Sequence, residues 1–170
     1  MRINKLALTN FRSYNSLELD LEPGVITFIG DNGSGKTNIA ESLIYLAFLS
    51  SHRVANNVPL ISLGNQQAII RAEVQRDERT LQIDLEINAS KANRARINGN
   101  PTRSQRELLG AIQIVYFSPE DLDLVRGEPG NRRDFLDRLL ITRTPRLAGV
   151  IADYERVVKQ RNALLKTRTS

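Results

Sequence analysis

The chain has 170 residues, 41% of them hydrophobic and 25% charged, which is an ordinary composition for a folded globular protein. It contains no cysteine and one histidine, which excludes a disulfide framework, a Cys/His zinc cluster and a thiol nucleophile. The first residues lack the apolar core of a signal peptide, and no apolar stretch approaches the ~20 residues of a membrane span. We therefore expect a soluble, cytoplasmic protein without a membrane partner.

The net charge of +5 is unevenly distributed along the chain. Residues 1–90 carry 8 basic and 10 acidic side chains, whereas residues 91–170 carry 16 basic and 9 acidic ones. This excess of +7 in the second half favours a polyanionic partner, with nucleic acid as the first candidate. The alternative is a set of arginine-rich surfaces that only face solvent, since 19 of the 24 basic residues are arginine.

The first predicted elements are two strands and a short apolar run. Residues 3–8 and 17–21 alternate apolar and polar side chains, which predicts a hairpin closed through residues 10–16. Residues 25–29 read Val-Ile-Thr-Phe-Ile and are predicted to form a strand buried on both faces of a central sheet. After a glycine-rich stretch, residues 36–49 place apolar side chains at helical spacing, which predicts an amphipathic helix.

The middle of the chain is predicted to form a loop followed by an antiparallel meander. Residues 50–67 show little periodicity, which indicates a loop with at most one short helix. Residues 68–76, 80–88 and 95–99 alternate apolar with polar side chains and are separated by turn residues. This pattern is typical of strands that have one buried and one solvated face.

The last third of the chain turns from strand to helix. Residues 111–117 are predicted to form another buried strand, and Ser104 with Glu107 fits a capping box before it. The helix-start pattern Ser-Pro-Glu-Asp follows at residues 118–121, and three helices are expected to end the chain. We therefore expect a first lobe over residues 1–117 and a helical segment, the start of a second lobe, over residues 118–170.

One motif carries chemistry with high specificity: residues 30–37 satisfy the P-loop pattern G-x-x-x-x-G-K-[S/T] at every specified position. A predicted strand precedes the motif and a predicted helix follows it, so backbone N–H groups and the helix N-terminus can surround a phosphate. Lysine supplies a charge for the β- and γ-phosphates, and the threonine hydroxyl suits Mg2+. A chance glycine-rich turn is the alternative. The predicted ATP-binding residues are Gly30, Asp31, Asn32, Gly33, Ser34, Gly35, Lys36 and Thr37, with Thr37 as the magnesium ligand.

The surroundings of the loop favour one class of P-loop protein. An Asn-Lys-x-Asp motif, typical of GTPases, does not occur in the sequence. Two strands before the nucleotide strand and an antiparallel meander after its helix fit an ABC ATPase-like lobe. We therefore expect an α/β P-loop NTPase with a mixed or antiparallel β-sheet. A P-loop small-molecule kinase and a nucleotide-binding interaction module without hydrolysis are the alternatives.

Longer stretches carry a resemblance to a known family. Residues 5–53 resemble the head domain of the RecF family, bacterial recombination-repair proteins related to SMC ATPases. Further matches occur at Phe-Ser-Pro-Glu-Asp-Leu (117–122), at residues 124–137 and at residues 160–166. The resemblance covers essentially the whole chain, and these later stretches are more specific than the phosphate loop.

The resemblance implies an ATP-dependent DNA-binding protein of recombinational repair, replication and the SOS response. It implies ATP and Mg2+ as cofactors, duplex or gapped duplex DNA, and RecO- and RecR-like partners. Family members are longer, and their signature loop, Walker B acid and switch histidine follow the helical region. The chain thus resembles their ATP-binding N-terminal part, for which efficient hydrolysis is not expected. An ATP-dependent homodimer is implied for the full-length protein.

Three further positions near the motifs carry side chains that could take part in a site. Arg12 matches the place where SMC-type ATPases put a basic side chain against the nucleotide, and a solvated turn arginine is the alternative. Glu120 is a candidate acid near the expected Mg2+-sensing position, although an acidic residue at this place also suits a helix start. His52 has no acid or second histidine beside it, so a catalytic role is not expected.

A basic cluster flanks the predicted turn at Asn98-Gly99. Arginine forks at such a hairpin can bind phosphates of duplex DNA, whereas the scarcity of aromatic residues disfavours stacking on single strands. A solvated strand face is the alternative. The predicted DNA-binding residues are Lys91, Arg94, Arg96 and Arg103.

Overall fold

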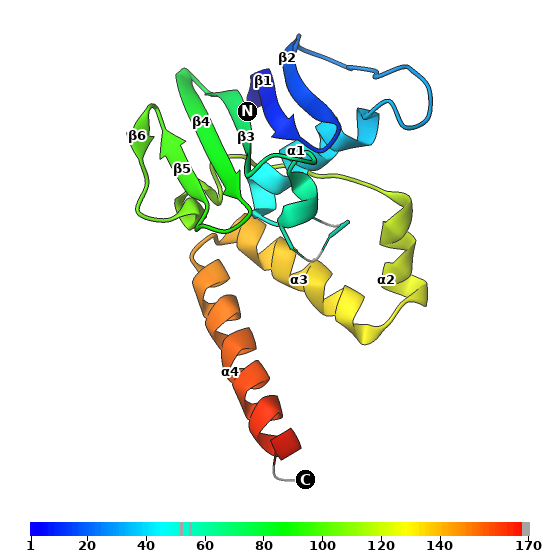
Figure 1. The fold of residues 1–170 in the computed structure, drawn as a ribbon, viewed down its shortest axis with the longest axis vertical. Helices are drawn as coiled ribbons and strands as arrows, with labels where there is room; N and C mark the ends of the chain where they lie inside the picture. The colour runs from blue at the N-terminus through cyan, green and yellow to red at the C-terminus, as the bar shows by residue number, and fades with distance from the viewer. Residues whose placement is uncertain (52, 55, 168–170) are drawn as a thin grey trace. The chain divides into compact units, whose positions relative to one another are not determined.

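The computed structural model describes residues 1–51, 53–54 and 56–167, without the side chains of Glu120 and Asp123. The chain divides into two compact units, of which the first ends at Tyr116 and the second begins at Phe117. Figure 1 shows the elements in chain order. None of the described helices is both long and apolar enough to cross a membrane.

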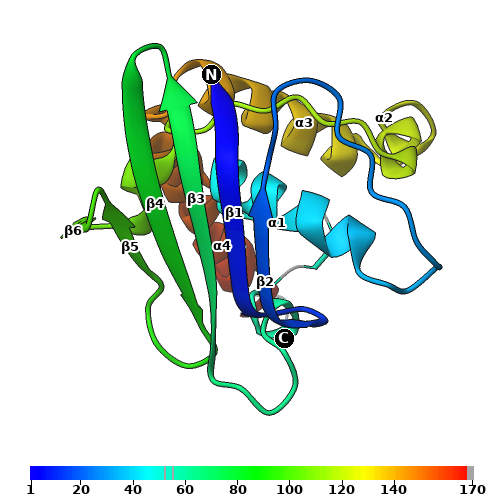
Figure 2. The ribbon, with the colours of Figure 1, turned by 90° about the horizontal axis from the view of Figure 1, so that it is seen from above.

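The first unit is built on one antiparallel sheet of six strands. The strands lie in the order β2-β1-β3-β4-β5-β6, as Figure 2 shows from above. The predicted hairpin and the predicted meander are therefore confirmed, and β3 pairs with β1 to join them. The strands are β1 (Arg2–Phe11), β2 (Tyr14–Asp20), β3 (Gln67–Arg76), β4 (Arg79–Asn88), β5 (Arg94–Ile97) and β6 (Asn100–Pro101).

Helix α1 (Lys36–Phe48) covers one face of this sheet. The alternation of each strand places every second side chain on that face, where the register aligns Leu8, Ile70 and Leu85 across three strands. Tyr45 and Leu46 of α1 complete the same buried cluster. The apolar pattern along the strands and the helix thus defines a single core between the sheet and α1.

The opposite face of the sheet carries charged residues in register. Arg71 on β3 pairs with Asp84 on β4, with 3.6 Å between Nε and Oδ1, and Asp84 in turn lies opposite Arg96 on β5. Glu86 lies opposite Arg94 one step along. Opposite charges on neighbouring strands favour this pairing, so the second face is solvated and polar as predicted.

The first unit also contains two short 3-10 helices: η1 (Val58–Leu60), between α1 and β3, and η2 (Gln105–Leu108), after β6. The predicted capping box at the start of η2 is confirmed: the Ser104 hydroxyl and the Glu107 carboxylate both bind backbone N–H groups. Tyr45 holds the loop before η1, because its hydroxyl donates to Asn57 Oδ1 at 2.9 Å. Burial raises the pKa of Tyr45 to about 12, so the phenol stays neutral.

The second unit is helical. A 3-10 turn leads into three α-helices, as predicted, and the Asp121 carboxylate accepts the Ser118 N–H at 2.7 Å where this unit starts. Arg132 Nη1 donates to the carbonyls of Leu124 and Gly127, which ties α2 to α3. No described side chain of α3 or α4 is buried. The helices are η3 (Pro119–Leu122), α2 (Asp123–Arg126), α3 (Pro129–Arg143) and α4 (Leu147–Thr167).

Two predicted strands are wrong. Residues 25–29 and residues 111–117 adopt no strand, and Val25 and Val115 are fully exposed. Both runs are apolar on both faces. A run of this kind forms a strand only if neighbouring strands pair with both of its edges. In the described part of the chain neither run is a member of the six-stranded sheet.

The position of the core generates a stability prediction. Leu85→Ala should lower the free energy of unfolding by about 2–5 kcal/mol, because Leu85 is completely buried on the covered face. Leu63→Ala is the matched control, since Leu63 is fully exposed and should change stability by no more than about 0.5 kcal/mol. Urea denaturation followed by circular dichroism measures both values. Equal effects of the two substitutions would contradict this core.

Candidate nucleotide-binding site

The P-loop, residues 30–37, leads into α1, whose first two residues are Lys36 and Thr37, and is closed by its own lysine. Lys36 Nζ donates to the carbonyl oxygens of Gly30 and Asp31, both at 2.6 Å, and to Ser34 Oγ at 3.3 Å. The ammonium group therefore lies within the curve of the loop. Because Lys36 is the first residue of α1, the loop also directs the positive end of the helix dipole toward the same space.

Gly35 is the residue that requires glycine most strictly. It is buried and has a φ of +98°, in the left-handed region that side chains disfavour. A Cβ at this position would lie 2.7 Å from the hydroxyl oxygen of Tyr14 and 2.8 Å from Ser13 Oγ. The loop thus packs directly against the turn between β1 and β2, and this contact holds the start of α1 at the end of the sheet.

A cavity of about 350 Å³ lies at the loop. Lys36 and Thr37 line it from the start of α1, and Arg53 lines it from the segment that follows α1. A positive helix end, an ammonium group and a guanidinium group together suit a polyphosphate. The lining residues are Asn32, Gly33, Gly35, Lys36, Thr37, Asn38 and Arg53.

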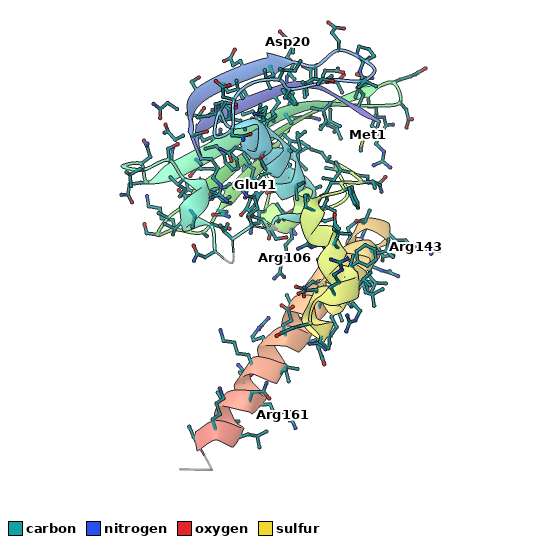
Figure 3. The ribbon with its side chains drawn as sticks, turned by 90° about the vertical axis from the view of Figure 1, so that its right-hand side faces the viewer. Met1, Asp20, Glu41, Arg106, Arg143 and Arg161 are labelled. Atoms are coloured by element: carbon teal, nitrogen blue, oxygen red, sulfur yellow. The ribbon has the colours of Figure 1, made fainter. Side chains whose placement is uncertain are left out.

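A buried carboxylate lies one turn further along α1. Glu41 is completely buried, and Figure 3 labels it on α1 beneath the sheet. Arg12 binds it through two hydrogen bonds, from Nη2 to Oε1 at 2.6 Å and from Nε to Oε2 at 2.9 Å. Ser51 Oγ donates to Oε1 at 2.5 Å, and Arg53 Nη1 donates to Oε2 at 3.1 Å. Four donors thus satisfy one carboxylate.

These donors decide the charge of Glu41. Burial by itself raises the pKa of a carboxyl group, but the hydrogen bonds from Arg12 and Ser51 and the charges of Arg12 and Arg53 outweigh it. The pKa of Glu41 therefore lies below its ordinary value of 4.5, and the group is ionised at neutral pH.

Of the predicted P-loop residues, five line the cavity, whereas Gly30, Asp31 and Ser34 accept hydrogen bonds from Lys36 and do not line it. Arg12 lies on a different partner. The Arg12 guanidinium is occupied by Glu41 and by the carbonyl oxygen of Pro59, at 2.9 Å from Nη1, and it does not line the cavity. A nucleotide contact of Arg12 stays a prediction. His52 and the side chain of Glu120 lie outside the described residues.

The predicted basic cluster lies along β5 and the segment after it. Arg94, Arg96 and Arg103 line a hollow of about 420 Å³ on the charged face of the sheet, together with Arg71 of β3. Lys91 is exposed in the turn before β5 and does not line the hollow. Three of the four predicted residues are thus brought together. The carboxylates of Asp84 and Glu86 line the same hollow and offset part of its positive charge.

Sequence reasoning missed Glu41 and Arg53. A signal for Glu41 exists, because it lies on the side of α1 that also carries the buried Ile44 and Tyr45, and a carboxylate buried in a helix needs a cationic partner. Arg53 has no comparable signal. Its segment lacks periodicity, and only the fold of the loop after α1 brings it to the cavity.

A glycine-rich loop closed by its lysine, at the start of a helix that covers a sheet, is the arrangement of a P-loop NTPase lobe. The chain belongs to the AAA ATPase domain family, whose model matches residues 1–128.

The relatives are more specific than the family. The chain is 53% identical over 170 residues to the DNA replication and repair protein RecF of Kineococcus radiotolerans. The aligned region covers 100% of this chain and 44% of that protein. It is 60% identical over 168 residues to RecF of Renibacterium salmoninarum, over 98% of this chain and 42% of that protein. The resemblance to RecF is confirmed: the chain is homologous to an N-terminal part of these proteins and spans less than half their length.

Solved structures agree. A structure titled as the recombination mediator protein RecF-ATPrS has a TM-score of 0.89 and 26% identity, over 98% of this chain and 45% of that chain. A solved structure from a study of ATP-driven dimerization of SMC ATPases has a TM-score of 0.62 and 21% identity. The match covers 81% of this chain and 98% of that chain. The expected ABC ATPase-like fold is confirmed.

The ionised Glu41 generates a pH prediction. Because its pKa is lower in the folded chain than in the unfolded chain, its stabilising contribution is complete above pH 4.5 and is lost as the pH falls through the lowered pKa. The Glu41→Gln variant should lose less stability than the wild type over this acid range. Urea denaturation at pH 7 and at successively lower pH measures the difference, and parallel curves for both proteins would contradict the assignment.

Proposed function

We propose that the chain is the ATP-binding N-terminal part of a RecF-type DNA replication and repair ATPase. The observation that carries this proposal is that Lys36, whose Nζ donates to the Gly30 and Asp31 carbonyls across the loop, also lines the cavity. This supports a role of the P-loop lysine in binding β- and γ-phosphates. RecF relatives at 53–60% identity support the same function over a small-molecule kinase.

Magnesium fits this proposal through one protein ligand. Thr37 lines the cavity next to Lys36, and its hydroxyl is the kind of oxygen ligand that Mg2+ accepts. The described residues contain no cluster of three or more His, Cys, Asp or Glu side chains that could hold the ion. Thr37 would therefore hold Mg2+ together with phosphate oxygens and water, and the ion would neutralise charge on the phosphates.

Hydrolysis is expected to need more than these residues supply. Turnover requires an acid that orients the attacking water and a charge that stabilises the transition state. The cavity lining contains no carboxylate. In the proposal, the chain binds ATP, and the longer RecF-type protein supplies the remaining groups and the ATP-dependent homodimer.

DNA binding is proposed for the charged face of the sheet. Arg94, Arg96 and Arg103 lie close enough to line one hollow, and Lys91 adds an exposed charge nearby. Because Asp84 and Glu86 partly neutralise these arginines, we expect moderate, salt-sensitive affinity for duplex or gapped duplex DNA. RecO- and RecR-like proteins are the proposed partners of the full-length protein.

The ATP site is tested by one substitution. Lys36→Ala should weaken binding of Mg-ATP by roughly 1.5–3 kcal/mol, because a charge-assisted contact to phosphate is lost. Isothermal titration calorimetry measures the affinity, and a phosphate-release assay should detect turnover near background in both proteins.

Lys5→Ala is the matched control, since Lys5 lies on the solvated sheet face and pairs with Asp20. It should bind Mg-ATP as the wild type does. Equal affinity of the Lys36 variant and the wild type would refute the ATP site, and robust hydrolysis by the chain would show that an acid outside the cavity lining takes part.

The DNA site is tested by salt dependence. Replacing both Arg94 and Arg96 by alanine should flatten the plot of log K against log[NaCl] by about 0.9 for each phosphate contact that is lost. Fluorescence anisotropy with a labelled duplex measures this slope. The matched control replaces Arg76 and Arg79, a pair of arginines at the β3–β4 turn outside the cluster. Identical slopes for both double variants would place the DNA site elsewhere.

A further inference from the structure

Arg53 and Glu41 connect the phosphate cavity to the rest of the first unit. Arg53 is the member of the Glu41 cluster that lines the cavity, and its side chain is 39% exposed. Arg12, by contrast, is 16% exposed and uses three of its nitrogens on Glu41 and Pro59. Of the two arginines on this carboxylate, Arg53 is therefore the one that a bound phosphate can reach.

The cluster carries an excess positive charge. Two guanidinium groups share the single carboxylate of Glu41, which stays ionised because its pKa is lowered. Arg12 takes both carboxylate oxygens in a bidentate pair at 2.6 and 2.9 Å, whereas Arg53 makes one bond at 3.1 Å. Arg12 thus neutralises most of the carboxylate, and the charge that remains lies on Arg53 at the cavity.

Arg53 is held in position by several bonds. Its Nη1 donates to Glu41 Oε2 and to Asn38 Oδ1, each at 3.1 Å, and its backbone N–H donates to Ser51 Oγ at 3.0 Å. Ser51 in turn donates to Glu41. Both side-chain bonds use the same nitrogen, and a guanidinium has five N–H donors in a fixed fork. Donors therefore remain for a phosphate while Glu41 fixes the arginine.

We infer that Glu41 is a positioning residue for nucleotide binding, which holds the Arg53 guanidinium at the wall of the phosphate cavity so that Arg53 binds the polyphosphate together with Lys36. The inference rests on the proposed ATP site. It assigns to Glu41 no contact with the nucleotide: its effect on affinity passes through Arg53. Through Arg12, the same carboxylate links this arrangement to the β1–β2 turn.

A double-mutant cycle on Mg-ATP affinity tests this coupling. Arg53→Gln removes the guanidinium, and Glu41→Gln removes the charge that holds it while keeping its shape. Each single variant should weaken Mg-ATP binding by about tenfold, the lower end of a charge-assisted contact. The double variant should be no weaker than Arg53→Gln by more than about twofold, because residues that act through one another are not additive.

Asp153→Asn is the matched control, because Asp153 also pairs with an arginine, Arg156, but lies on α4, outside both proposed sites. It should leave Mg-ATP affinity unchanged. Unfolding free energies are measured for every variant, since a structural role of Glu41 would lower stability without coupling to Arg53 in the affinity cycle. If Glu41→Gln does not fold, Glu41→Asp takes its place in the cycle, because it keeps the charge but shortens the side chain that holds Arg53.

The outcomes separate the inference from the proposed function. Wild-type binding that is weakened by Lys36→Ala but unaffected by Arg53→Gln overturns the inference and leaves the ATP site intact. Additive losses in the double variant, or tighter binding by Glu41→Gln, also overturn it. A wild-type chain that does not bind Mg-ATP overturns the proposed function and, with it, the inference.

Discussion

The first unit depends on the position of helix α1, which has to cover the sheet and also begin at the phosphate cavity. Its apolar side must cover the sheet, where Tyr45 and Leu46 join the core, while its first residues must lie at the phosphate cavity. The contact of Gly35 with Tyr14 and Ser13 makes both possible, because only glycine allows the loop to approach the β1–β2 turn so closely. The position of Lys36 is thus set by the packing of the sheet.

Glu41 gives the same helix an electrostatic connection. A buried carboxylate is stable only with partners, and here these come from two separate segments: Arg12 from the β1–β2 turn, and Ser51 and Arg53 from the chain after α1. The loops around the cavity are therefore held by charge, while the sheet and α1 are held by apolar packing.

Much of the fold could be predicted from the sequence, and the errors have one physical cause. The hairpin, the meander and α1 have patterns that indicate which side is buried, and within the hairpin and within the meander each strand pairs with its neighbour in the chain. Residues 25–29 and 111–117 are mostly apolar without alternation. Such a run indicates that the segment is buried, but it does not indicate which strands or helices pack against it. Neither segment pairs within the sheet of the described residues, so local pattern alone misassigned both.

For the site, the sequence by itself determined the P-loop, because the spacing of its glycines, Lys36 and Thr37 is dictated by local backbone geometry around a phosphate. It also determined the charge of residues 91–170 and the relation to RecF. Only the tertiary structure decided that Arg12 lies on Glu41, that Arg53 reaches the cavity wall, and that Asp84 and Glu86 face the predicted DNA-binding arginines. The physical reason is sequence separation. Arg12 and Glu41 are 29 residues apart, and the strength of an ion pair depends on burial and distance, which the fold alone sets.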